Sequence, residues 1–195
     1  MENQPALPWR EIPNFFAALV KIDTVSARAL EFTILTAART NETIGAEWPE
    51  VNIQCRLWVV PADRIKARRE HRVPLSKNAV GILSRMRKEQ AGSDGFIFPG
   101  ARTGEPLSDM SMLMTLRRMN CLNITTHGFR SSFRDWAAEA TDSPREVAEM
   151  ALAHVVESKV EAAYRRGDLL EKRAQLMKRW DAYCFSKSKN SAAKM

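Results

Sequence analysis

Apolar residues recur at helical spacing over most of the chain, three or four positions apart. The first such stretch covers residues 12–20 and the second covers 26–38. Further amphipathic stretches begin at Ser76 and Ser108, and a last one covers 169–184. The pattern therefore predicts a fold made mainly of helices.

The middle of the chain follows a different pattern. Residues 51–53, 57–60 and 72–75 are short runs of β-branched, aromatic or other apolar residues, separated by polar and charged turns. Such runs are typical of paired strands, and 63–70 would form the tip of one hairpin. The predicted fold class is mainly α with a small antiparallel β-sheet (α+β).

The clearest helical pattern follows Thr125 and Thr126, either of which can cap a helix N-terminus. At about 100° per residue, an apolar face and a basic face of this helix lie about 120° apart. The segment Ser143–Glu146 then has the form of a capping box with proline at the first helical position. The predicted apolar face holds Phe129, Phe133, Trp136 and Ala140, and the basic face holds His127, Arg130 and Arg134.

A chain of 195 residues can form one domain with its own core. We expect a linker stub at 1–10, a folded domain at 11–185 and a disordered tail at 186–195, where lysine, serine and alanine predominate. No apolar stretch approaches the roughly 18 residues of a membrane helix, and no signal-peptide pattern is present. These features predict a cytoplasmic protein.

Cysteine and histidine spacing gives no sign of a disulfide or metal site. Cys55, Cys121 and Cys184 are too few and too far apart for a disulfide framework, so we expect reduced residues in the core. The three histidines lack metal-ligand spacing, and neither a phosphate-binding glycine loop nor a nucleophile elbow occurs. The sequence therefore predicts neither a metal nor a cofactor.

Positive charge is concentrated in one stretch of the chain. The sequence has 30 lysines and arginines against 23 acidic residues, a formal net charge of +7. Residues 56–88 contain ten basic and two acidic residues, so the remainder is close to neutral. A confined basic excess is typical of a surface that binds a polyanion such as DNA. An ordinary solvated surface can have the same composition.

Six side chains suited to phosphate chemistry occur along the chain. Alone, each has an ordinary explanation: an arginine at a helix end can pair with a glutamate three residues on, and a histidine there can be purely structural. The phenolic and basic residues are of interest as a set, because their order and spacing form a pattern. They are Arg39, Lys66, His127, Arg130, His154 and Tyr164.

This pattern resembles the catalytic domain of tyrosine recombinases, the phage integrase family. Members have Thr-x-x-Arg-x-x-Glu, a lysine on a β-hairpin, His-x-x-Arg, Leu-x-His and then a tyrosine. The resemblance covers roughly residues 7–184, and 131–137 and 163–168 are particularly similar to integrases of prophages and genomic islands. The matching segments here are Thr36–Glu42, Arg64–Leu75 with Lys66, His127–Arg130, Leu152–His154, and Tyr164 ten residues after His154.

The resemblance implies site-specific DNA recombination and integration by metal-independent transesterification, through a 3′-phosphotyrosyl intermediate. Its residue types suit that chemistry, since tyrosine can attack phosphorus and arginine offers two parallel donors to phosphate oxygens. The roles implied are nucleophile for Tyr164, phosphate binding for Arg39 and Arg130, protonation of the leaving 5′-oxygen for Lys66, acceptance of the tyrosine proton for His127, a hydrogen bond to phosphate from His154, and orientation of Arg39 by Glu42.

The implied partner is duplex DNA at attachment sites, with self-association into a tetramer on DNA. The chain departs from the family in two ways. First, Ala37 and Ala38 stand where many members have glycine. Second, only the end of a linker to N-terminal DNA-binding domains is present, as in a catalytic domain isolated by cloning or by gene truncation. The arginines expected to bind DNA are Arg64, Arg68, Arg69, Arg72, Arg134, Arg165 and Arg166.

Three other hypotheses remain open on the sequence. Type IB topoisomerases share the same chemistry. A truncated integrase remnant would bind DNA without productive strand exchange. A basic helical regulator would carry a helix-turn-helix, although no short helix pair with a turn glycine is evident.

Overall fold

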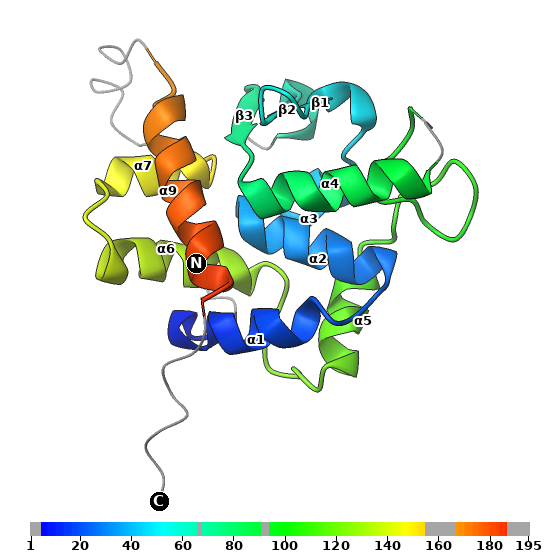
Figure 1. Cartoon of the computed structure of the whole chain (residues 1–195), viewed down its shortest axis with the longest axis horizontal. Helices are drawn as coiled ribbons and strands as arrows, with labels where there is room; N and C mark the ends of the chain where they lie inside the picture. The colour runs from blue at the N-terminus through cyan, green and yellow to red at the C-terminus, as the bar shows by residue number, and fades with distance from the viewer. Residues whose placement is uncertain (1–4, 66–67, 91–93, 155–166, 187–195) are drawn as a thin grey trace, which may run out of the picture.

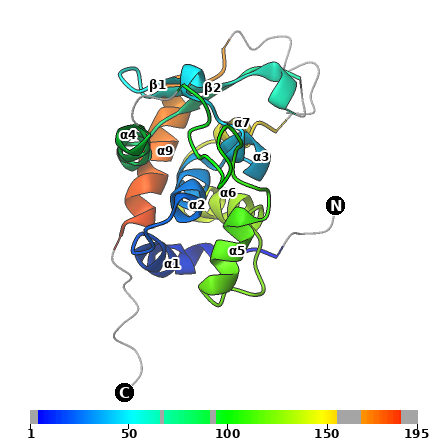
Figure 2. The same ribbon diagram turned by 90° about the vertical axis from the view of Figure 1, so that its right-hand side faces the viewer.

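Helices make up most of the structure, and a small sheet lies at the end opposite α1 (Figures 1 and 2). The computed structural model describes residues 5–65, 68–90, 94–154 and 167–186. Within these ranges the predicted mainly helical α+β fold is confirmed. The helices are α1 (Ile12–Leu19), α2 (Val25–Thr36), α3 (Thr40–Ile44), α4 (Lys77–Glu89), α5 (Ser111–Arg118), α6 (Gly128–Ala140), α7 (Arg145–Ala151) and α9 (Leu170–Cys184).

Helix α2 is the central helix of the fold. It packs against α1, α3, α4, α5 and α9, and its residues from Ala27 to Thr36 are all buried. Thr24 starts the helix, because its Oγ1 accepts the Ala27 N–H at 3.2 Å. The helix ends two residues before its predicted end, because Ala37 takes a left-handed conformation with φ 52°.

The conformation of Ala37 leads to a stability prediction. A left-handed alanine costs roughly 1–2 kcal/mol, whereas glycine adopts this conformation freely. Ala37 and Ala38 are both buried, but only Ala37 has a positive φ. Both glycine variants lose one buried methyl group, so we expect Ala37→Gly to be about 1 kcal/mol more stable than Ala38→Gly in urea unfolding. Equal stability of the two variants would show that the Ala37 backbone is unstrained.

The sheet has three antiparallel strands in the order β1-β2-β3. Val60 pairs with His71 at one end of the β2–β3 ladder. The connection between these strands therefore contains the predicted hairpin tip, and it begins with a short 3-10 helix at Ala62–Arg64. The three predicted strands are confirmed: β1 (Val51–Asn52), β2 (Leu57–Val60) and β3 (His71–Pro74).

Helix α9 packs across α2, α7 and β3 and completes the core (Figure 1). Trp180 on this helix is fully buried and donates its indole N–H to Ile34 O at 2.8 Å. Its ring also contacts Phe133 and Trp136 of α6. The last amphipathic stretch of the sequence is thus a core helix, as predicted.

Helix α6 differs from its predicted form in two respects. His127 occupies the N-cap position, while Thr125 Oγ1 accepts the Gly128 N–H at 3.1 Å from further out. Arg130 is buried rather than part of an exposed basic face, and Ala140 is exposed rather than on the apolar face. Arg130 is buried by the packing of other elements, and carbonyl groups at two other helix ends bind its guanidinium.

Two smaller expectations are wrong. Pro144 is the N-cap of α7 and no side chain caps that helix, so Ser143 does not form a capping box. Cys55 is exposed rather than in the core, because it lies in the turn after β1, where Asn52 Oδ1 accepts its N–H at 2.8 Å. Cys184 is buried as expected.

Candidate active site

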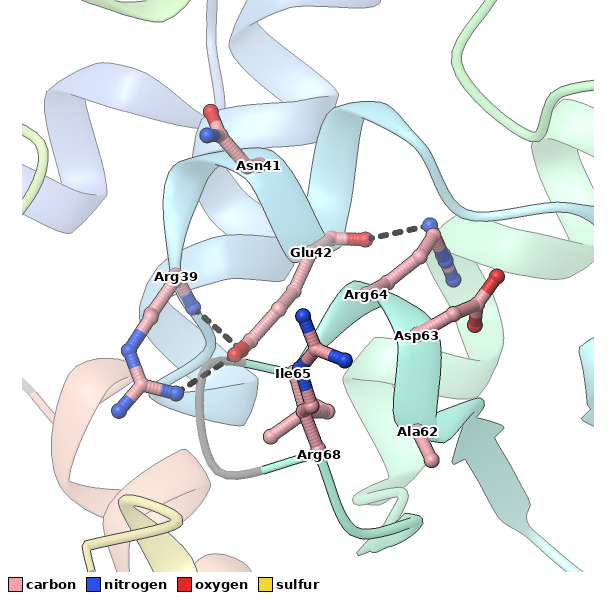
Figure 3. A pocket seen from close by; sticks show the side chains of 8 residues that line it. All are labelled: Arg39, Asn41, Glu42, Ala62, Asp63, Arg64, Ile65 and Arg68. Carbon is pink, nitrogen blue, oxygen red and sulfur yellow. Dashed lines mark hydrogen bonds and ion pairs between the residues drawn. The ribbon is translucent and has the colours of Figure 1, made fainter.

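Arg39 lies at the junction of α2 and α3. Its backbone N–H donates to Glu42 Oε2 at 2.8 Å, and its Nη1 donates to Glu42 Oε1 at 2.7 Å. Glu42 is 3% exposed, whereas the Arg39 side chain is 25% exposed. Figure 3 shows that only one terminal nitrogen of Arg39 faces Glu42. Glu42 thus caps α3 and orients Arg39, and among the described residues no hydrogen bond to the other edge of the guanidinium is seen, where an anion could bind.

Arg130 is a buried cation held by two helix ends. Its Nη1 donates to Ala37 O, after α2, and its Nη2 donates to Leu152 O, after α7, at 2.6 Å. Carbonyl groups at helix C-termini carry partial negative charge and suit a guanidinium. Burial, and then the charge of Arg39, lowers the pKa of Arg130 to about 10. Arg130 therefore remains protonated at neutral pH, close to a second positive charge.

His154 is attached to the same guanidinium. Its Nε2 lies 3.2 Å from Arg130 Nη2, and its Nδ1 lies 2.6 Å from Glu149 Oε2. A neutral ring with its proton on Nδ1 satisfies both contacts, since Nδ1–H donates to Glu149 and Nε2 accepts from Arg130. A hydrogen bond from Nε2 to a phosphate would require a second proton on the ring.

His127 is exposed at the N-terminus of α6. Partial burial, followed by the charges of Arg130 and Arg39, lowers its pKa below the usual value. A histidine in such surroundings stays neutral to lower pH than usual and can accept a proton at neutral pH. The structure thus brings Arg39, Glu42, Arg130, His127 and His154 into one electrostatically coupled group.

The sequence reasoning did not single out His71 as part of this group. It lies at the start of β3, and burial, followed by Arg173, lowers its pKa to about 4. Glu42, Arg130 and a backbone hydrogen bond to Ala151 also act on it. The only signal in the sequence is its position just beyond the predicted hairpin tip. His71 is thus a further neutral histidine near the arginine pair.

His71 predicts a pH effect on stability. A folded-state pKa of about 4, against 6.5 for the free side chain, means that the unfolded state binds more protons between these values. Its stabilising contribution is therefore lost as pH falls from about 6.5 to 4, by up to about 3 kcal/mol. Glu31 has the opposite effect, because burial raises its pKa to about 7.

The two effects are separated by comparing variants. We expect His71→Gln to lose less unfolding free energy than the unchanged protein between pH 7 and pH 4.5, measured by urea denaturation. Glu31→Gln should lose more, because it lacks the opposing contribution. Equal pH dependence of His71→Gln and the unchanged protein would contradict the role of His71.

Arg64, predicted to bind DNA, has its guanidinium bound within the protein. Its Nη2 pairs with Glu50 Oε2, which also accepts the indole N–H of Trp58 at 2.9 Å, and its Nη1 lies 3.5 Å from Glu42 O (Figure 3). The Arg64 side chain thus links the start of the β2–β3 connection to α3. A cavity of about 710 Å³ lies at this junction. It is lined by Arg39, Asn41, Glu42, Ala62, Asp63, Arg64, Ile65 and Arg68.

The other predicted DNA-binding arginines differ in their surroundings. Arg68, Arg69 and Arg134 are exposed. Arg72 is also exposed but pairs with Asp168 Oδ2 at 3.4 Å. Lys66, Tyr164, Arg165 and Arg166 lie outside the described residues.

The described part of the chain holds neither a metal-binding cluster nor a membrane helix. It contains no group of three or more histidine, cysteine or acidic residues placed to hold a metal ion. None of its helices is long and apolar enough to cross a bilayer.

Known proteins with similar sequences include prophage integrases. Prophage integrase IntA of Escherichia coli (strain K12) is 33% identical over 183 residues, which cover 92% of this chain and 44% of that protein. Prophage integrase IntZ of the same strain is 34% identical over 173 residues, covering 88% and 42%. The chain thus spans less than half the length of these two relatives.

Solved structures with a similar fold include integrases. The integrase from mycobacterium phage Brujita has a TM-score of 0.67 and 18% identity, over 93% of this chain and 60% of that chain. A lambda integrase dimer bound to a COC′ core site has a TM-score of 0.58 and 21% identity, over 86% and 61%. The integrase-like fold is therefore confirmed. Because residues 6–187 match the phage integrase family over most of the sequence, this chain belongs to that family.

Proposed function

We propose that this domain cleaves and rejoins duplex DNA by metal-independent transesterification, in site-specific recombination and integration. The Tyr164 oxygen forms a bond to phosphorus as the bond to the 5′-oxygen breaks, which leaves a 3′-phosphotyrosyl ester. His127 takes the phenolic proton and Lys66 gives one to the departing 5′-oxygen. Reversal of these steps rejoins a strand, so the phosphodiester bond energy is retained.

The observation that supports this function best is the convergence of Arg39 and Arg130. The pentavalent phosphorus of the transition state carries more negative charge on its non-bridging oxygens than the ground state does. Two guanidinium groups fixed by Glu42 and by backbone carbonyls can neutralise this charge without rearranging. Burial, and after it repulsion from Arg39, lowers the pKa of Arg130, and a phosphate between the two guanidinium groups would relieve that repulsion.

Two lambda integrase structures support the proposed partners. One is a dimer bound to a COC′ core site, and another is a tetramer bound to a Holliday junction. By analogy, we propose that this chain binds attachment-site DNA and assembles into a tetramer on it. Action on such DNA also supports a cytoplasmic location.

A trapping experiment tests the proposed reaction. The protein is incubated in EDTA with a pool of duplexes that carry bridging 5′-phosphorothiolates, whose poor 5′-thiol nucleophile prevents rejoining. We expect a protein–DNA adduct that survives detergent, with one DNA sequence enriched in it. Retardation in native gels without any adduct would favour the alternative, a remnant that binds DNA without strand exchange.

Salt dependence separates the arginines that contact DNA from those that support the fold. Each phosphate contact contributes a slope of about −0.9 to the log–log dependence of affinity on salt. We expect Arg69→Ala to make the slope shallower by about 0.9, the contribution of one phosphate contact, without changing the free energy of unfolding. Arg64→Ala should instead lower the unfolding free energy by about 1–3 kcal/mol, because Glu50 loses its partner. Equal slope changes in both variants would contradict the assignment of Arg64 to the interior.

A further inference from the structure

The segment Pro5–Trp9, here called the N-terminal strap, lies along helix α6. Pro5 O accepts the N–H of Thr125 at 3.1 Å, just before the helix begins. Leu7 O accepts the hydroxyl of the buried Ser132, one turn into the helix. The strap therefore follows the first turn of α6, the turn from which His127 and Arg130 project.

Gly128 is the point of closest approach between strap and helix. A Cβ atom on Gly128 would lie 2.2 Å from Pro5 O and 2.9 Å from Ala6 Cα, both backbone atoms. Such distances are far below van der Waals contact, so any side chain here must displace either the strap or the helix. The φ of Gly128 is not positive, so contact rather than backbone conformation requires glycine.

The far end of the strap is fixed to two helices. Trp9 donates its indole N–H to Glu139 Oε2 at 3.0 Å, in the last turn of α6. Its carbonyl accepts the hydroxyl of Tyr183 on α9 at 3.2 Å, and the two rings lie 5.6 Å apart. Because both ends of the strap are bound, it cannot move away freely. A side chain at Gly128 would therefore displace the start of α6 as well as the strap.

We propose that the N-terminal strap is a positioning element of the active site, which sets the location of the first turn of α6 and thereby of His127 and Arg130 relative to Arg39. Its effect on cleavage rests on the proposed function. Its effect on the geometry of His127 does not. Among the described residues, the strap forms no hydrogen bond with either arginine, so we expect it to act through the helix.

Gly128→Ala is the direct test, with Gly81→Ala as the matched control. Gly81 lies in α4, and a Cβ there would have no atom within 4 Å. Because burial, Arg130 and Arg39 depress the His127 pKa, a shift of the first turn should change it. We expect NMR titration to show the His127 pKa moving toward its ordinary value in Gly128→Ala and unchanged in Gly81→Ala. An unchanged His127 titration in Gly128→Ala would overturn the proposal.

A double-mutant cycle identifies the strap as the cause. Deletion of residues 1–6 from the chain removes the backbone atoms of Pro5 and Ala6 that a Cβ on Gly128 would meet. In a deleted chain whose thermal melt remains cooperative, Gly128→Ala should cause no further change in the His127 titration. If Gly128→Ala changes the His127 titration equally with and without residues 1–6, its effect arises within α6 and the proposal is overturned.

Ser132→Ala gives an independent test if Gly128→Ala fails to fold. This variant removes only the hydroxyl that donates to Leu7 O. The His127 titration should move in the same direction by a smaller amount, and an unchanged titration would again overturn the proposal. In the trapping assay, Gly128→Ala should reduce the cleavage rate at least tenfold with unchanged DNA affinity. If the unchanged protein forms no adduct, the proposed function fails while the NMR result still decides the role of the strap.

Discussion

Tyr164→Phe is expected to abolish the covalent DNA adduct while leaving DNA binding and thermal stability almost unchanged. Only the phenolic oxygen can form the phosphotyrosyl ester, and no other group at that position can replace it. The unperturbed phenol has a pKa near 10, so the proposed attack at neutral pH needs a proton acceptor, the role that we propose for His127. The measurement is the detergent-resistant adduct on phosphorothiolate duplexes, with native gels for binding and a thermal melt for stability.

Tyr183, the only other tyrosine, is the matched control. Its ring packs against Trp9, Trp136 and Trp180, and its hydroxyl donates to Trp9 O. A side chain held in this way serves the fold. Tyr183→Phe should retain the adduct and lose about 0.5–1.5 kcal/mol of unfolding free energy with the hydrogen bond. An adduct that persists in Tyr164→Phe, or disappears in Tyr183→Phe, would contradict the assignment of the nucleophile.

Elements with strong local patterns could be predicted from the sequence. The strands and helix α9 are defined by runs of apolar residues at period two or near 3.6, which local geometry dictates. The short helix α3 was not predicted, because its start depends on two hydrogen bonds that Arg39 donates, from its backbone N–H and its guanidinium, to the Glu42 carboxylate. In the sequence alone, the same pair indicates only an ion pair at a helix end.

The surroundings of the site arginines could not be predicted, because they depend on distant parts of the chain. Arg130 binds a carbonyl 93 positions before it and another 22 positions after it. Helical periodicity placed its side chain on an exposed face, and only the packing of α2 and α7 buries it. Arg64 shows the same limit, since a basic residue near a hairpin tip indicates DNA binding until the carboxylate of Glu50 is located.

The two arginines of the site should respond differently to replacement by lysine. Both variants keep the charge but lose the planar pair of donors, so we expect each to slow adduct formation at least about a hundredfold. Arg39 pairs with a carboxylate that lysine can also reach, so Arg39→Lys should change the unfolding free energy by less than about 1 kcal/mol. Arg130 spans the carbonyls of Ala37 and Leu152, and a single ammonium group cannot reach both.

One buried carbonyl in Arg130→Lys is therefore left without a donor, which costs about 1–3 kcal/mol. Cleavage assays and urea unfolding of the two variants measure both effects. If Arg130→Lys unfolds at the same urea concentration as Arg39→Lys, the two carbonyls are not what holds Arg130 in place. If Arg130→Lys cleaves at the unchanged rate, a point charge suffices and bidentate phosphate binding is wrong. Loss of both activity and stability in Arg130→Lys, beside loss of activity alone in Arg39→Lys, would show that Arg130 serves the reaction and also joins α2 to α7.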